Sequence, residues 1–471
     1  MRVGTAVKFI IYIGIFLIAT GTILEDSLIK KAEEISGGYS MNKLVISPMK
    51  PSDSGLKSGL SYDDAKGIAK AFRNAQVTFT SEANVKTPDM KGINEIKLIG
   101  TNYLYANFDN LVFVQGRFFD KAEDSSNSKV AVIDEKLAVT LFGSTDVVGM
   151  TVKISDGRFK IVGVYSVKDS VVDQLSDSGI HSVYVPVGVQ DSLGIKSSVN
   201  TVQVISNGDR LLESAAKTAL ISIGKSPDEF LIKDYGTKRV LMKQKVSIII
   251  FIFGIVCIAS IIIYLAKRLL YRSNLLKNVL QSYYSADILR NNTLHILMGM
   301  LKAVLAVVLI FAIWRIVRFE IYIPKDNIPD RIIDFSFYFD LIKKGAQDSV
   351  ASLGSIPLIF EIKLNNINRI LNWVFYLQLF AGIPLIIIGL YMQKCQNTSF
   401  INAFTHYSIV FGISVIASLS FMFAGIPPNF NPYNLMIVYL FLTVLLFKFL
   451  KGKVIKYEKN TSINSGSLND F

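Results

Sequence analysis

The sequence predicts an α+β extracytoplasmic domain inserted between transmembrane helices 1 and 2 of an α-helical membrane protein with about six spans. Three observations lead to this prediction. Apolar residues make up 51% of the 471 residues and are concentrated in blocks, which is typical of integral membrane proteins. A long polar region separates the first two blocks and contains both strand and helix patterns. Lysine and arginine collect at the ends of several blocks, as they do at cytoplasmic helix ends.

Six apolar segments are long enough to cross a bilayer as helices. They are expected at Phe9–Leu24, Val246–Ala266, Ile296–Val317, Leu371–Met392, Phe404–Gly425 and Leu435–Leu450. The first segment also fits a signal peptide, because 19–21 offers small residues for cleavage. An uncleaved anchor is the favoured interpretation, since the later spans require a first helix here.

The spans divide the chain into six segments. We expect a first transmembrane helix at 1–24, an extracytoplasmic domain at 25–243, transmembrane helices 2 and 3 at 244–317 with a cytoplasmic connector at 267–294, an extracytoplasmic loop at 318–370, transmembrane helices 4 to 6 at 371–450, and a cytoplasmic disordered tail at 451–471. Within the loop, the pattern at 334–342 predicts a short amphipathic helix on the membrane surface. The residues after Lys459 are polar, which favours disorder.

Charge bias orients the spans. Basic residues precede the first span at 2–8 and follow the second and sixth spans at 267–272 and 451–459. Because lysine and arginine near span ends stay on the cytoplasmic side, both termini are expected inside the cell. The region 25–243 is then expected outside.

The region 25–243 alternates strand and helix patterns. Strands are expected at 42–48, 77–80, 96–99, 130–133, 151–154, 159–164, 182–186 and 201–205, and helices at 62–72, 135–142 and 211–223. Ser61 fits an N-cap for the first of these helices, and Gly143 fits the end of the second. Residues up to about Asn110 form one expected lobe. Residues 116–186 form a second, more regular lobe, to which 201–205 adds a strand.

The stretch from Gly116 to Tyr165 carries the most specific signal. It contains GRFF, then VAVIDEKLAVTLFG, then VGMTVKISDGRFKIVGVY, which is a strand–helix–strand–strand pattern. Asp156-Gly157 between two apolar strands predicts a tight hairpin that pairs 151–154 with 159–162. Gly157 is expected at positive φ in this turn.

The order of these pieces resembles the MacB-like extracytoplasmic core domain of MacB/FtsX-type ABC transporter permeases. In that family the pattern is GRxF, a strand, a helix with LA and LFG, a VG, a hairpin, and a strand ending in VGV. The matching residues are Gly116, Arg117, Phe119, Val132, Leu137, Ala138, Leu141, Phe142, Gly143, Val148, Gly149, Phe159, Val162, Gly163 and Val164. The transmembrane half diverges from the family, because only 1–8 precedes the first span and an extra pair of spans follows the fourth.

The resemblance implies a permease-like membrane subunit in the bacterial cytoplasmic membrane. Such a subunit transmits ATP-driven motion of a partner ATPase to the extracytoplasmic domain, in export or another envelope-related process. The resemblance also implies an ABC ATPase subunit acting in trans and pairing of permease subunits as a homo- or heterodimer. ATPase activity is then expected only in the partner subunit. The alternative is a non-transport membrane scaffold or sensor that uses the MacB-like domain for extracytoplasmic binding.

In MacB-like permeases, the connector between spans two and three carries a short helix that docks onto the ATPase, often with an RxxEIGxxKAxGA-like motif. Here 267–292 contains KRLLYRSNLLKNVLQSYYSADILRNN, without the acidic residue or either glycine of that motif. The candidate ATPase-coupling residues are Arg272, Leu275, Leu276, Lys277, Val279, Tyr283, Tyr284 and Asp287. A basic amphipathic connector lying on anionic membrane lipid explains the same residues, and both interpretations stay open.

No catalytic, cofactor or metal site is expected in the chain. The Gly-Lys-Ser at 224–226 lacks the earlier glycine of a phosphate loop, because Ala219 occupies that position. His181 follows 177–179 on one loop, where a catalytic triad could not assemble, so a structural or surface histidine is expected.

The cysteines and histidines have no metal-ligand spacing. A nucleic-acid partner is not expected. The basic excess of the whole chain, a net charge of +13, has a simple membrane explanation, and the region 25–243 mixes both signs throughout.

The predicted topology can be tested by cysteine labelling. In a cysteine-free background, a membrane-impermeant thiol reagent added to intact cells should label Ser52→Cys and Asn429→Cys but not Ser465→Cys. Permeabilised cells supply the control, since all three sites should then react. Labelling of Ser465→Cys in intact cells would contradict the topology.

Overall fold

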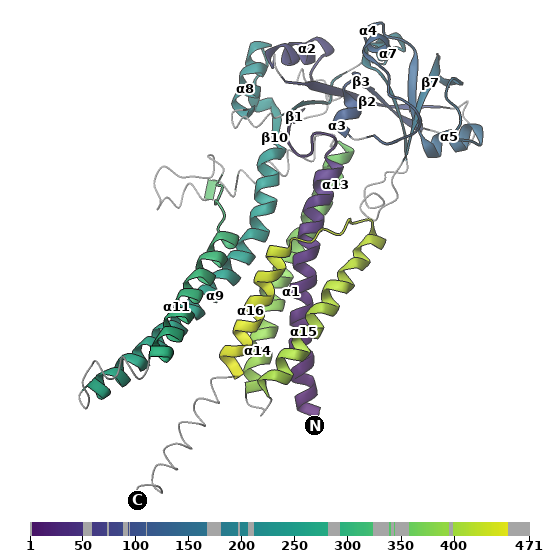
Figure 1. The fold of residues 1–471 in the computed structure, drawn as a ribbon. Coiled ribbons are helices and arrows are strands. Elements are labelled where there is room, and N and C mark those ends of the chain that lie inside the picture. Colours follow the sequence, from purple (N-terminus) through teal and green to yellow (C-terminus); the bar gives the residue numbers. More distant parts are fainter. Residues whose placement is uncertain are drawn as a thin grey trace, which may run out of the picture. The chain divides into compact units, whose positions relative to one another are not determined.

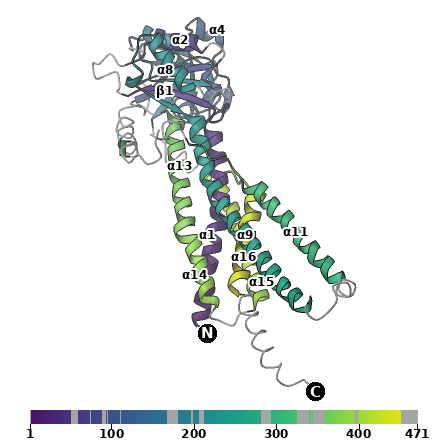
Figure 2. The ribbon, with the colours of Figure 1, turned by 90° about the vertical axis from the view of Figure 1, so that its left-hand side faces the viewer.

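The computed structural model describes residues 2–49, 59–72, 75–87, 93, 95–109, 111–166, 180–195, 198–205, 212–280, 293–323, 339–340, 343, 358–394 and 399–450 (Figures 1 and 2). The chain divides into two compact units. The outer unit comprises Ile29–Met242 and Tyr322–Arg369, and the membrane unit comprises Met1–Leu28, Lys243–Ile321 and Ile370–Phe471. Most of the amphipathic helix predicted at 334–342 lies outside the described residues.

A mixed β-sheet forms the core of the outer unit. Its ten strands in the described part of the chain are β1 (Lys43–Pro48), β2 (Val77–Lys86), β3 (Glu95–Thr101), β4 (Phe113–Gly116), β5 (Val130–Asp134), β6 (Thr151–Ile154), β7 (Gly157–Tyr165), β8 (His181–Pro186), β9 (Thr201–Ile205) and β10 (Phe230–Asp234). They lie in the order β10-β1-β9-β2-β3-β8-β5-β7-β4, and β6 pairs with β7 beside this path. The pairs β3–β8 and β5–β7 are parallel, so the predicted α+β class is confirmed.

Helices pack on this sheet (Figure 1). They are α2 (Tyr62–Ala71), α3 (Tyr105–Asp109), α4 (Lys121–Ser125), α5 (Glu135–Phe142), α7 (Val187–Ser192) and α8 (Leu212–Ser222). Ser61 caps α2 through a capping box with Asp64, and Gly143 ends α5 with a φ of 74°. Both predicted helix boundaries are therefore confirmed.

The two predicted lobes are joined in one continuous sheet. β3 pairs with β2 on one side and with β8 on the other, so backbone hydrogen bonds cross the lobe boundary. The prediction that 201–205 extends the second lobe is wrong, because β9 pairs with β1 and β2 of the first lobe. Every residue of β9 (TVQVI) is buried, so the side chains do not show from the sequence which strands lie beside it.

The predicted hairpin exists, but its turn lies one residue earlier than expected. Ile154 pairs with Gly157, so β6 pairs with 157–160 instead of 159–162. The turn residues are Ser155 and Asp156, and Ser155 adopts the positive φ, at 50°. The expectation of a positive φ at Gly157 is therefore wrong, because this glycine begins the second strand.

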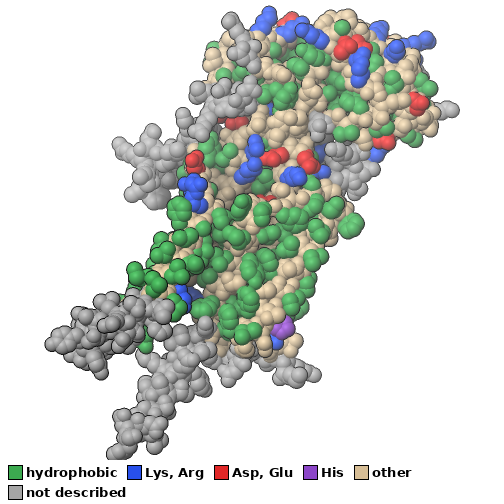
Figure 3. Space-filling model, viewed as in Figure 1, with side chains coloured by type: hydrophobic (Ala, Val, Ile, Leu, Met, Phe, Trp, Pro, Cys, Tyr) green, Lys and Arg blue, Asp and Glu red, His purple; other side chains and the backbone are tan. Residues whose placement is uncertain are grey.

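Six helical segments of the described chain are long and apolar enough to cross a membrane, which confirms the six predicted spans. They are α1 (Arg2–Ile35), α9 (Tyr235–Leu280), α11 (Thr293–Val317), α13 (Ile359–Leu377) continued by a π-helical turn (Gln378–Gly382) and α14 (Ile383–Lys394), α15 (Phe400–Ala417) continued by a 3₁₀ segment (Ser418–Ala424), and α16 (Pro432–Leu450). Apolar side chains dominate the surface of these helices in the membrane unit (Figure 3).

Three of these helices extend more than ten residues beyond the predicted spans at one or both ends. α1 continues past Leu24, α9 begins before Val246, and α13 begins before Leu371, within the segment predicted as a loop. Hydropathy marks only the lipid-facing part of a helix, whereas the additional turns of α13 are buried against protein at Leu364 and Ile367. Each of the three helices carries residues of both units.

Small residues bring α1 close to α14. A Cβ at Gly14 of α1 would lie 2.6 Å from the Ile386 side chain, and a Cβ at Gly389 of α14 would lie 2.3 Å from Ile11. The absent side chains let the two helices approach and exchange van der Waals contacts, as small residues do between transmembrane helices. The contact accounts for much of the burial of α1, the most enclosed of the six spans.

Replacement of Gly157 by valine is expected to destabilise the outer unit through packing. A Cβ at this position would lie 2.7 Å from the Phe159 ring and 2.8 Å from Leu193, and overpacking of this kind costs about 1–3 kcal/mol. Thermal unfolding of the full-length protein in detergent measures the effect. Ser155→Gly is the matched control, because it relieves the positive φ and should not lower the melting temperature. A Gly157→Val protein that melts with the wild type would refute the packing argument.

Candidate functional site

The described part of the candidate coupling segment is helical. α9 continues beyond Ala266, the predicted end of span two, to Leu280 without a break. Its last turns therefore contain Arg272, Leu275, Leu276, Lys277 and Val279. The remaining candidates, Tyr283, Tyr284 and Asp287, lie outside the described residues. The helix brings the first five candidates together, and their role in ATPase coupling stays a prediction.

A buried carboxylate joins three elements of the outer unit. Glu361, in the first turn of α13, is 1% exposed. Its Oε1 accepts hydrogen bonds from Lys233 Nζ at 3.1 Å and from the Tyr235 hydroxyl, and its Oε2 accepts one from the Leu358 backbone N–H at 3.1 Å. Lys233 lies on β10 and Tyr235 begins α9. The carboxylate thus ties α13 to β10 and α9, and these charge-assisted bonds offset the cost of burying it.

A fully buried lysine lies near this carboxylate. Lys43 on β1 donates from Nζ to the Phe108 carbonyl at 3.2 Å, and Nζ lies 3.6 Å from the centroid of the Phe360 ring. Burial lowers the pKa of Lys43 to about 8, and the carboxylates of Asp109 and Glu361 oppose this shift. The Lys43 ammonium on β1 therefore makes a cation–π contact with the Phe360 ring of α13, which adds to the contacts of Glu361.

A second, half-buried carboxylate completes the group. Asp109 of α3 accepts a hydrogen bond from the Tyr105 hydroxyl at 3.0 Å. Burial raises the pKa of Asp109, while Lys43 and the Tyr105 hydrogen bond lower it. We call Lys43, Asp109, Lys233, Tyr235 and Glu361 the charge junction. Its pairings hold elements of the fold together.

Sequence analysis missed the charge junction because its members are far apart in the chain. One signal was available, since Lys43 stands at the start of an otherwise apolar strand pattern. Nothing local indicated that Glu361 would supply the opposite charge.

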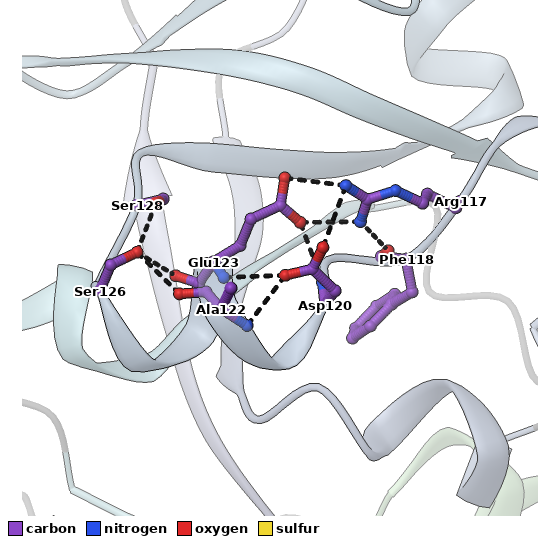
Figure 4. Close-up of polar contacts among 7 residues, drawn as sticks. All are labelled: Arg117, Phe118, Asp120, Ala122, Glu123, Ser126 and Ser128. Atoms are coloured by element: carbon purple, nitrogen blue, oxygen red, sulfur yellow. Dashed lines mark hydrogen bonds and ion pairs between the residues drawn. The ribbon is translucent and has the colours of Figure 1, made fainter.

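Arg117 of the GRFF motif holds helix α4 in place. Its guanidinium donates to both carboxylate oxygens of Glu123, at 2.8 and 3.1 Å, and to the Phe118 carbonyl at 2.9 Å (Figure 4). Asp120 caps the helix by accepting from the backbone N–H groups of Ala122 and Glu123, both at 2.9 Å. This motif residue thus stabilises the local fold of its lobe.

The residues rejected as catalytic candidates also have structural roles. His181 Nδ1 lies 3.1 Å from the Asp134 carboxylate, which caps α5 by accepting from the Leu137 N–H. This contact is consistent with the expectation of a structural or surface histidine. Lys225 lies in the predicted loop after α8 and donates to the Gly59 carbonyl at 3.1 Å. No group of three or more His, Cys, Asp or Glu side chains among the described residues could hold a metal ion.

Comparison with known proteins identifies the domain. Residues 9–219 match the family model described as the MacB-like periplasmic core domain. The predicted resemblance to MacB/FtsX-type permeases is therefore confirmed. So is the prediction of a multi-pass cytoplasmic membrane protein with a large extracytoplasmic domain.

Two curated relatives show how far the similarity extends. The macrolide export ATP-binding/permease protein MacB of Neisseria meningitidis is 22% identical over 257 residues, which cover 54% of this chain and 40% of that protein. The uncharacterized ABC transporter permease YknZ of Bacillus subtilis is 26% identical over 182 residues, which cover 39% of this chain and 43% of that protein. The chain thus spans less than half the length of the relatives it matches.

Solved structures of similar domains are also found. The periplasmic region of MacB from Actinobacillus actinomycetemcomitans is 21% identical, with a TM-score of 0.35, over 43% of this chain and 92% of that chain. The extracellular domain of the noncanonic ABC-type transporter YknZ from Gram-positive bacteria is 20% identical, with a TM-score of 0.33, over 41% of this chain and 100% of that chain.

Lys43 is expected to make the stability of the outer unit depend on pH. Its pKa is about 8 in the folded protein and higher in the unfolded chain, so the unfolded state binds more protons above pH 8. Stability should therefore rise with pH between about 8 and 10, with a Lys43 contribution of up to about 1.4 kcal/mol per pH unit. Lys43→Met should remove this contribution, seen as a smaller rise of the melting temperature with pH.

Lys70→Met is the matched control for this titration. Lys70 is exposed on α2, so its removal should leave the pH dependence as in the wild type. Equal pH dependence in the wild type and in Lys43→Met would contradict the assignment to Lys43.

Proposed function

We propose that this chain, which has the MacB-like core domain of the MacB/FtsX-type permeases, is the permease subunit of an ABC system for export or another envelope-related process. One observation carries the proposal: residues 9–219 match that domain in a chain with six candidate membrane spans. The relatives named above are called an ATP-binding/permease protein and an ABC transporter permease. Pairing of two permease subunits, as a homo- or heterodimer, belongs to the same proposal and rests on the resemblance alone.

In this proposal, ATP hydrolysis belongs to a separate ATPase subunit. The Gly-Lys-Ser sequence lies in the loop after α8, where Lys225 is bound to the Gly59 carbonyl and lies 3.6 Å from the Asp64 carboxylate. These contacts support a structural role for this lysine. The MacB relatives are named as both ATP-binding protein and permease, and the matched part of this chain covers 40% of the first of them.

Motion of the ATPase would reach the core domain through helices. α1, α9 and α13 each carry residues of both units without an interruption of the helix. α9 has 46 residues and is therefore about 70 Å long, more than twice the roughly 30 Å thickness of the hydrocarbon layer. A displacement at its C-terminal turns would act on Tyr235, its first residue, and through Tyr235 on Glu361. The charge junction is then the point at which α9 and α13 act on the sheet together.

Substitution of Leu276 and Val279 by aspartate is expected to abolish co-purification with the ATPase. If the end of α9 inserts apolar side chains into a groove on that partner, two carboxylates there would be buried without partners, at a cost of several kcal/mol. Affinity purification of the full chain from its native host in mild detergent, followed by an assay for captured ATP hydrolysis, measures the loss. Membrane insertion and the melting temperature should be unchanged.

Ser273→Asp is the matched control, because Ser273 is exposed on the same helix and should tolerate the charge. Retention of the ATPase by the Leu276→Asp, Val279→Asp protein would exclude this docking site and support a connector that lies on lipid. If the wild-type chain captures no ATPase, the permease proposal fails, and the membrane scaffold or sensor replaces it.

A further inference from the structure

The third membrane span carries a lysine within its apolar stretch. Lys302 lies on α11, whose span is Leu297–Val317, and by helical rise it is about 8 Å inside the start of that span. Its side chain is exposed, so it does not point into the helix bundle. A charged side chain at this depth in a membrane is costly and needs a partner.

The surroundings of Lys302 are mostly lipid. Only 6% of the apolar stretch of α11 is buried, and α11 lies beside α9 at the edge of the membrane unit (Figures 1 and 2). Leu301 and Leu305, which flank Lys302 along the helix, are 64% and 65% exposed. Leucines exposed on a membrane span contact acyl chains, so lipid lies next to this lysine.

Two cations of α9 lie at the same depth as Lys302. The two helices are consecutive antiparallel spans, and a Cβ at Gly254 of α9 would lie 2.5 Å from the Val317 side chain of α11. By helical rise, Arg268 is about 21 Å from this contact along α9, and Lys302 is about 22 Å from it along α11. Lys267 is the neighbour of Arg268. Since α9 begins in the extracytoplasmic domain, this depth belongs to the inner leaflet.

No carboxylate of these helices balances the three cations. Neither α9 nor α11 contains an aspartate or a glutamate. Within the described part of the chain, no side-chain hydrogen bond or ion pair engages Lys267, Arg268 or Lys302. Like charges at one depth repel each other and attract an anion. Because acyl chains already contact α11 here, the anion that fits both the charges and the apolar side chains is a lipid headgroup.

We propose that Lys267, Arg268 and Lys302 form a binding site for an anionic phospholipid of the inner leaflet. Its acyl chains lie along Leu301 and Leu305, and its phosphate is held between α9 and α11. Long basic side chains extend from an apolar stretch to the headgroups while their stems stay in lipid. Arginine binds a phosphate through two parallel N–H donors, and lysine adds a point charge. The proposal is independent of the function proposed above.

Fluorescence quenching in reconstituted vesicles tests the site. The reporter is the full-length chain with Leu305→Trp as its single tryptophan, since Trp314 and Trp373 are replaced by phenylalanine. The vesicles are phosphatidylcholine with a minor fraction of phosphatidylglycerol, and the acyl chains of one lipid or the other are brominated. Brominated phosphatidylglycerol should quench the reporter more than its share of the bilayer predicts, and this local excess measures binding. Leu301→Trp replaces the reporter if Leu305→Trp does not insert.

Lys302→Gln should lower the local excess of phosphatidylglycerol by about fivefold, the effect of one basic residue near an anionic membrane surface. Lys302→Arg keeps the charge and should retain the excess. Lys394→Gln is the matched control, because it removes an exposed lysine from the inner end of α14 and thus the same charge from the same side of the membrane. It should leave the excess unchanged.

The proposal is overturned if brominated phosphatidylglycerol quenches no more than its share. It is also overturned if Lys302→Gln and Lys394→Gln lower the excess equally, because the basic residues would then attract anionic lipid without forming a site. Loss of the excess on addition of inorganic phosphate at constant ionic strength would identify a soluble phosphate as the ligand and exclude the lipid.

Discussion

The burial of one carboxylate, that of Glu361, constrains how the outer unit is assembled. An unpaired Glu361 carboxylate would be strongly destabilising at this buried position. The first turn of α13 must therefore lie where Lys233 and Tyr235 can donate to it. Those two residues stand at the end of β10 and at the start of α9. Lys43 extends the same arrangement to β1 and α3, because its ammonium lies over Phe360 and donates to Phe108. Sheet and helices are thus positioned by complementary buried charges as well as by apolar packing.

Local signals in the sequence were enough to predict much of the sheet. α5 was predicted with its observed limits, since Asp134 and Gly143 cap a short helix between two apolar strands. Contacts between residues far apart in the sequence could not be predicted. The hairpin turn shifted to Ser155 and Asp156 because Gly157 is needed as a strand residue beside Phe159 and Leu193, which no local pattern reveals. The neighbours of β9 and the early start of α13 depend likewise on contacts made after the chain has folded.

The same limit applies to the candidate sites, where local features could be predicted from the sequence and long-range contacts could not. The resemblance to MacB-like permeases pointed to the residues at the end of α9, but it did not indicate that they continue the helix of the second span. Glu25 stood at the edge of a predicted span, where a charged residue is unremarkable. Gln378, which comes from a helix more than 300 residues away, contacts it in the folded chain, and Gly21 leaves space for that amide. A charge whose partner is distant in sequence is found only in the folded protein.

The continuity of α9 also limits how this gene can change over evolution. Each residue inserted into or deleted from the helix would turn everything beyond it by about 100° and move it by about 1.5 Å. No loop is present within α9 to absorb such a change. Homologues should therefore differ in this helix by substitution and keep its length, whereas loops such as the turn at Ser155 remain free to vary in length.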